Sequence, residues 1–168
     1  MRLPPPSDPT IKEDQTMAVK PIPDGYHSIT PYLVVPDAPK TIAFLKQAFG
    51  ATTLFEPMKR PDGSIGHAEL KIGDSPLMLS EASEQCPATQ AMIHLYVPDV
   101  DATYKKALAA GATSVMEVAD QFYGDRSGGV KDPAGNSWYV ATHKEDVAPQ
   151  ELAKRAAAFF KQKQGQAA

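Results

Sequence analysis

The feature that most constrains the fold is an internal repeat, because motifs of the first half recur in the second half at nearly constant spacing. The offsets between matching motifs are 62, 61 and 62 residues. Such a period indicates a chain built from two copies of one structural unit. The matches pair Val35-Pro36-Asp37 with Val97-Pro98-Asp99, Gly50-Ala51-Thr52 with Gly111-Ala112-Thr113, and Gly73-Asp74-Ser75 with Gly135-Asn136-Ser137.

Each copy has the pattern of a strand, a helix and three further strands. In the first copy, SITPYLVVP predicts a strand, and Asp37 and Gly50 suit the start and end of a helix that runs to about Ala48. In the second copy, MIHLYVP predicts a strand, Asp99 caps a helix and Gly111 ends it. The later strands are expected at Thr52–Met58, Gly66–Ile72 and Pro76–Ser80, and again at Ser114–Ala119, Ser127–Lys131 and Ser137–Thr142.

One such unit leaves one face of its sheet uncovered, whereas two units together enclose a cavity. We therefore predict an α+β fold with two tandem βαβββ modules forming a curved, half-barrel mixed sheet, plus a C-terminal helix. The predicted domain spans residues 25–145, with modules at 25–84 and 88–145. The proline-rich residues 1–24 are predicted to be extended or disordered. Residues 146–168 are predicted to form an amphipathic helix that packs on the domain or on a second subunit.

Composition excludes several classes of protein. The 17 Lys and Arg residues against 20 Asp and Glu give a net charge of −3, which offers no electrostatic reason for a nucleic-acid or membrane partner. No apolar run is long enough to span a bilayer, and no secretory signal is recognisable, so we expect a cytoplasmic protein. Cys86 is the only cysteine, which excludes an intrachain disulfide and a four-thiolate zinc site.

The motifs as a set resemble one known family. ITPYLVV, FGAT, IGHAEL, LMLSE, HLYVPDVDATY, GDRSG and DPAGNSW are similar to the vicinal oxygen chelate superfamily of glyoxalases and bleomycin-resistance proteins, and within it to the PhnB-like branch. The match covers roughly residues 28–143 and implies a homodimer. Because the superfamily includes isomerases, dioxygenases, thiol transferases and drug binders, the resemblance implies the fold more than the activity.

The resemblance also allows a test for a metal site. The metal enzymes of the superfamily place their ligands on the first and last strand of each module. At the corresponding positions this chain carries no imidazole or carboxylate, the donors that Zn²⁺, Ni²⁺ and Fe²⁺ prefer. We therefore predict no metal at that site and no cofactor. The four positions are Thr30, Leu77, Met92 and Tyr139.

Strand alternation predicts which side chains line the cavity, because successive residues point to opposite faces of a sheet. Aromatic walls with few polar groups are typical of a small-molecule pocket. The alternative is that these side chains only fill a narrowed cup. We also expect Tyr123 in a lid loop, and Arg126 as a clamp for an anionic group unless it pairs with Asp125 or a glutamate. The predicted ligand-binding residues are Tyr32, Met92, His94, Tyr96, Tyr123, Arg126 and Tyr139.

Catalysis is left open by the sequence. His67 and Glu69 share one face of a strand, and with His94 they could form a displaced metal site or act in acid–base chemistry. Alternatively, Glu69 pairs with Lys71 or Arg126. The leading hypothesis is metal-independent binding of a small apolar or aromatic molecule. The alternatives are a glyoxalase-type lyase or isomerase that uses the displaced site or His94 as general base, and a protein that acts only through its surface.

Overall fold

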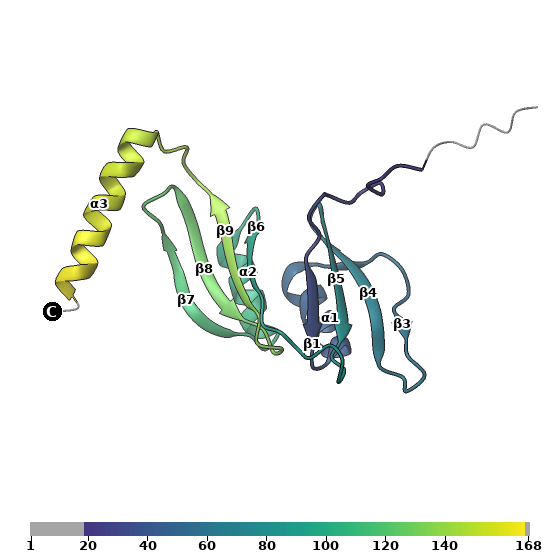
Figure 1. The fold of residues 1–168 in the computed structure, drawn as a ribbon. Coiled ribbons are helices and arrows are strands. Elements are labelled where there is room, and N and C mark those ends of the chain that lie inside the picture. Colours follow the sequence, from purple (N-terminus) through teal and green to yellow (C-terminus); the bar gives the residue numbers. More distant parts are fainter. Residues whose placement is uncertain (1–18, 167–168) are drawn as a thin grey trace, which may run out of the picture.

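The structure, a computed structural model, describes residues 19–166 as two modules of one plan and a separate helix (Figure 1). The first module contains β1 (Tyr32–Val35), α1 (Ala38–Phe49), β2 (Thr52–Thr53), β3 (Met58–Lys59), β4 (Ile65–Ile72) and β5 (Ser75–Glu81). The second contains β6 (Met92–Tyr96), α2 (Val100–Ala109), β7 (Thr113–Asp120), β8 (Asp125–Lys131) and β9 (Ser137–His143). The C-terminal helix is α3 (Pro149–Gln166).

Both module helices begin where the repeat predicts. The Asp37 side chain accepts a hydrogen bond of 2.9 Å from the Lys40 amide, and Asp99 accepts one of 2.9 Å from the Ala102 amide. Each aspartate thereby satisfies a helix N–H that has no partner within the helix. At the end of α1, Gly50 has φ 67, in the left-handed region that glycine enters without strain.

The two sheets have the same topology. The first has the order β1-β5-β4-β2 with β3 beside β4, and the second has the order β6-β9-β8-β7. In each, the first strand pairs in parallel with the last, and the other pairs are antiparallel. The predicted α+β class and the tandem βαβββ plan are confirmed. Within residues 19–166 the two sheets share no strand pair, and neither closes into a barrel.

One expected strand is interrupted. The predicted strand Thr52–Met58 is present as the two short strands β2 and β3, both paired with β4. Between them the chain leaves the sheet over residues 54–57. Pro57 has no amide hydrogen to donate to a neighbouring strand, which disfavours an uninterrupted pairing here.

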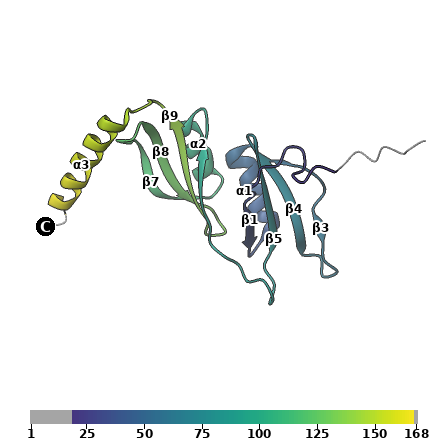
Figure 2. The same cartoon turned by 45° about the horizontal axis from the view of Figure 1, so that its top comes forward.

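The core lies between the sheets. Helices α1 and α2 pack against each other there, so each sheet has one face on the helices and one face directed away from them (Figures 1 and 2). We call these free faces the first and second outer face. The helix-facing side chains fill the interior, and the largest of them are Trp138, Leu33, Leu45, Leu70 and Leu79.

Helix α3 touches the second module through a few side chains. The Phe159 ring lies 4.9 Å from that of Phe122 in the β7–β8 loop, and Arg155 donates to both carboxylate oxygens of Glu145 at 2.8 and 2.9 Å. The rest of the helix extends from the body on the side of β7 (Figure 1). None of the helices within residues 19–166 is long and apolar enough to cross a membrane.

Candidate functional site

The second outer face gathers four of the predicted ligand-binding residues. The register pairs His94 with Tyr139 across β6 and β9, and alternation places Met92 and Tyr96 on the same side. Met92 is 74% exposed and Tyr96 is 62% exposed, and the His94 and Tyr96 rings lie 4.8 Å apart. Large apolar and aromatic side chains therefore remain open to solvent on this face of an isolated chain.

A polar cluster centred on Asp125 supports the second outer face. Asp125 is only 4% exposed, and its carboxylate accepts the Tyr96 hydroxyl at 2.9 Å and His143 Nδ1 at 2.7 Å. His143 Nε2 lies 3.1 Å from Asp146. Because both ring nitrogens face carboxylate oxygens, which only accept, His143 fits this position as the imidazolium.

Two pKa values in this cluster shift for the same reason. The hydrogen bond to Asp125, with a smaller contribution from Asp146, raises the pKa of His143. The hydrogen bond to Asp125 also raises the pKa of Tyr96, so its hydroxyl stays neutral and donates. Neither Asp125 nor His143 was among the predicted site residues. Alternation along β8 and β9 could have found the pair, since both residues point to the face that carries Tyr139.

The remaining two predicted residues of the second module lie apart from each other. The Tyr123 hydroxyl is 3.3 Å from Ser127 Oγ, at the edge of the second outer face. Arg126 lies on the helix side of β8, where Nε and Nη2 donate to Asp101 of α2 at 2.7 and 2.8 Å. This hydrogen bond holds the pKa of Asp101 below its usual range. The structure does not bring Arg126 together with the tyrosines.

The first outer face carries a chain of three polar side chains. The Tyr32 hydroxyl lies 3.3 Å from His67 Nδ1, and His67 Nε2 donates to Glu69 Oε1 at 2.9 Å. The Phe55 ring stacks over His67 at 6.1 Å. Glu69 therefore pairs with His67 and not with Lys71 or Arg126. The other carboxylate oxygen, Oε2, is buried and has no hydrogen-bond partner among residues 19–166.

The displaced metal site is not assembled within one chain. His67 and Glu69 lie on β4 of the first sheet, and His94 lies on β6 of the second. In the part of the chain that the structure describes, no group of three His, Cys, Asp or Glu side chains could hold a metal ion.

The register corrects one of the four positions tested for metal ligands. Tyr32 pairs with Met78 as His94 pairs with Tyr139, so the equivalent of Tyr139 is Met78 and not Leu77, which is buried. The repeat alignment of the two modules is shifted by one residue in β5, because the β4–β5 turn is shorter than the β8–β9 loop. A shift of one residue along a strand moves a side chain from one face of the sheet to the other. The corrected set, Thr30, Met78, Met92 and Tyr139, still offers hydroxyl and thioether groups that do not fit a divalent transition metal.

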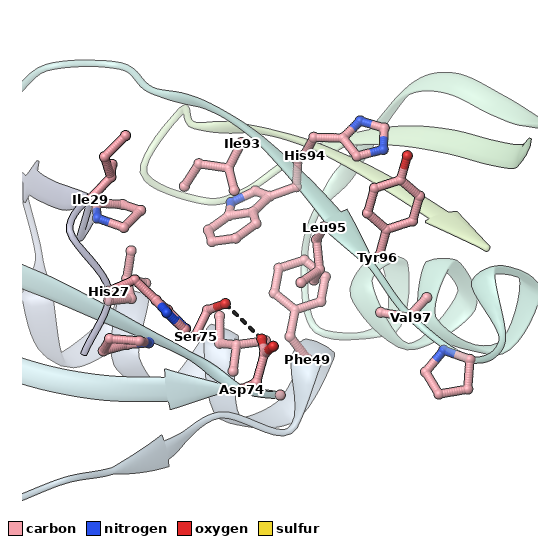
Figure 3. Close-up of a pocket in the computed structure, with 17 residues that line it drawn as sticks. His27, Ile29, Phe49, Asp74, Ser75, Ile93, His94, Leu95, Tyr96 and Val97 are labelled. Carbon is pink, nitrogen blue, oxygen red and sulfur yellow. Dashed lines mark hydrogen bonds between the residues drawn. The ribbon is translucent and has the colours of Figure 1, made fainter. Parts of the chain in front are cut away.

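A crevice of about 590 Å³ lies between the two modules and is lined by residues of both. Figure 3 shows His27, Ile29 and Ser75 of the first module opposite β6 of the second. Phe49 and Trp138 contribute to its walls. Its size suits a small ligand, but its lining is mostly apolar and contains only two of the predicted ligand-binding residues, His94 and Tyr96.

Comparisons with known proteins identify the family. The sequence profile of the Glyoxalase/Bleomycin resistance protein/Dioxygenase superfamily matches residues 25–140. An uncharacterized protein of Mycobacterium tuberculosis (strain CDC 1551 / Oshkosh) is 36% identical over 152 residues, covering 84% of this chain and 86% of that protein.

Solved structures of similar fold include TioX from Micromonospora sp. ML1, which is 27% identical with a TM-score of 0.57, covering 68% of this chain and 97% of TioX. The gene product AT5G48480 of Arabidopsis thaliana is 25% identical with a TM-score of 0.54, covering 69% of this chain and 98% of that protein. Since the profile spans most of the chain and agrees with the tandem βαβββ fold, the protein belongs to the glyoxalase/bleomycin resistance protein/dioxygenase superfamily.

Proposed function

We propose that this protein binds a small apolar or aromatic molecule between two tyrosine-bearing outer faces, without the help of a metal ion. The observation that carries the proposal is the exposure of Tyr32, Tyr96 and Met92, which lie on faces that no described helix covers. Contiguous apolar and aromatic side chains that are exposed to solvent are typical of surfaces that bind a ligand or another protein. The hydroxyls of Tyr32 and Tyr96 are held by His67 and Asp125, so the rings are positioned in advance.

The proposed pocket requires a second copy of the chain. The two outer faces of one chain point away from each other, with both helices between them (Figures 1 and 2). A twofold axis would place the first outer face of one copy against the second outer face of its partner. The dimer would therefore contain two equivalent pockets of this kind. The first strands β1 and β6 are the edge strands of their sheets, and an edge strand can pair with a strand of another chain. The protein is thus proposed to be a homodimer.

Two finer assignments belong to the same proposal. The motif set favours the PhnB-like branch of the superfamily, and a cytoplasmic location is proposed with it. The corrected metal positions support metal-independent binding, because their hydroxyl and thioether groups are poor ligands for zinc, nickel or ferrous iron.

Ligand-observed NMR with benzyl alcohol, indole and 2-naphthol, in the presence of EDTA, tests the proposal. We expect at least one to bind with a Kd of about 1 mM or tighter. Tyr96→Ser should weaken that binding, whereas Phe160→Ala, which removes an exposed aromatic ring on α3, should not. Sedimentation equilibrium should give twice the chain mass. Binding that disappears with EDTA and returns with zinc would instead support the metal-using lyase or isomerase.

A further inference from the structure

The carboxylate of Glu69 is buried yet only half satisfied. Its side chain is 11% exposed. Oε1 accepts from His67, and Oε2 has no donor among residues 19–166. A buried carboxylate oxygen without a donor destabilises the protein by more than a neutral oxygen would, because its hydration is lost and not replaced. On the first outer face, one buried carboxylate oxygen therefore lacks a hydrogen-bond donor.

Glu69 also lines a hollow of about 500 Å³, a volume within the range of small-molecule pockets. Residues 21–30 form one wall, including Tyr26 and Ile22, and Met78 lies beside Glu69 on the neighbouring strand. The walls are mostly apolar, and His27, Ser28 and Thr30 add polar groups to them. A hollow of this kind with one carboxylate suits a molecule that combines an apolar body with a donor group.

Nothing else in the described chain neutralises this carboxylate. The ion-pair partner of Glu69 among residues 19–166 is His67, and neither Lys71 on the same strand nor Arg60 pairs with it. The last torsion of a glutamate side chain has a broad energy minimum, so a small turn of the carboxylate presents Oε2 to the hollow. A charged donor there forms a stronger bond than a neutral one, because it meets an ionised acceptor away from bulk water.

We propose that the hollow over the first outer face takes a primary amine on an aromatic or apolar body, with the protonated amine donating to Glu69. This assignment rests on the proposed small-molecule binding and names the chemical class of the ligand. His67 donates to the other carboxylate oxygen of Glu69, Oε1, and the Tyr32 hydroxyl contacts His67 Nδ1. These contacts fix the orientation of the Glu69 carboxylate.

Calorimetric titration of the full chain with benzylamine and with benzyl alcohol tests the assignment, because the two probes share the same ring and differ in charge. At neutral pH with EDTA, we expect benzylamine to bind about tenfold more tightly than benzyl alcohol. Glu69→Gln should bring the ratio of the two affinities to about one, leaving benzyl alcohol binding unchanged. Retained benzyl alcohol binding also shows that the variant is folded.

Glu84→Gln provides the matched control, since it removes the same charge from an exposed loop outside the hollow. It should leave the benzylamine preference intact. Equal affinity of the wild type for the two probes, or a preference that survives Glu69→Gln, would overturn the assignment while leaving small-molecule binding in place. Failure of both probes and of indole and 2-naphthol would overturn the proposed function itself.

Discussion

The two modules share a backbone plan but place their carboxylates differently. The strand registers align Glu69 with Gly129 and His67 with Ser127, because Glu69 pairs with Met78 as Gly129 pairs with Tyr139. At Gly129 a side chain has no room, since a Cβ there would come within 2.9 Å of Val115 and 3.2 Å of the Tyr139 ring. In the second module the space above the strand is thus occupied by a tyrosine, and in the first it holds a carboxylate.

The second module has its own buried carboxylate at Asp125, and there the two modules differ in how well the charge is satisfied. Both oxygens of Asp125 have donors, from Tyr96 and His143. Glu69 has a donor on one oxygen only. The difference indicates that Asp125 stabilises its module. The unpaired oxygen of Glu69 lowers the stability of the first module and is available to a ligand.

The turns that connect the last two strands of each module also differ in how many hydrogen bonds their aspartate accepts. In the second module, Asp132 is buried and accepts from the Ala134 and Asn136 amides, from Asn136 Nδ2 and from Trp138 Nε1, at 2.9 to 3.0 Å. In the first module, Asp74 is exposed and accepts from its neighbour Ser75 at 2.8 Å.

The largest expected effect comes from Asp132→Ala. The change leaves several buried donors of Asn136 and Trp138 unpaired, so we expect the free energy of unfolding to fall by about 3 to 5 kcal/mol. Urea denaturation followed by circular dichroism measures this loss. Asp74→Ala, which removes the exposed carboxylate of the β4–β5 turn, should leave stability nearly unaltered. Comparable losses from the two changes would contradict the view that only the second turn is tied to the core.

A pair of charge-removing substitutions sharpens the comparison between the outer faces. Asp125→Asn replaces an acceptor of two good donors and should destabilise by about 2 kcal/mol. Glu69→Gln removes a buried charge that is half satisfied, so its effect should lie within about 0.5 kcal/mol of zero and can be stabilising. The same urea titrations compare the two. A loss at Glu69 as large as that at Asp125 would show that its free oxygen is satisfied in solution.

Local chemistry explains why much of the fold could be predicted. The helix caps at Asp37 and Asp99 and the turn at Gly50 depend on short-range geometry that the sequence shows directly. Period-two alternation likewise places Met92, His94 and Tyr96 on one face.

The features that sequence reasoning missed depend on long-range register. The exchange of Leu77 for Met78 follows from a difference in turn length, which a repeat alignment hides. The Asp125–His143 pair and the Arg126–Asp101 pair join residues 18 and 25 positions apart. The arrangement of the modules as two separate sheets depends on how α1 packs on α2, a contact without a sequence motif.

The smallest effect concerns the pH dependence of the second outer face. The carboxylates of Asp125 and, to a smaller extent, Asp146 raise the folded-state pKa of His143 above its ordinary value of 6.5. A raised folded pKa means that the stabilisation is fully present below about pH 6.5 and is lost as the pH rises through the folded pKa. The difference in unfolding free energy between wild type and His143→Gln should therefore shrink as the pH rises above 6.5.

Urea denaturation at a series of pH values measures this difference, and Asp146→Asn serves as a partial control. Asp146 is exposed and contributes the longer of the two hydrogen bonds to His143, so its removal should reduce the pH dependence without abolishing it. A difference between wild type and His143→Gln that grows with pH would mean that the neutral imidazole is the form that stabilises the fold, and Asp125 would then rely on Tyr96 as its main donor.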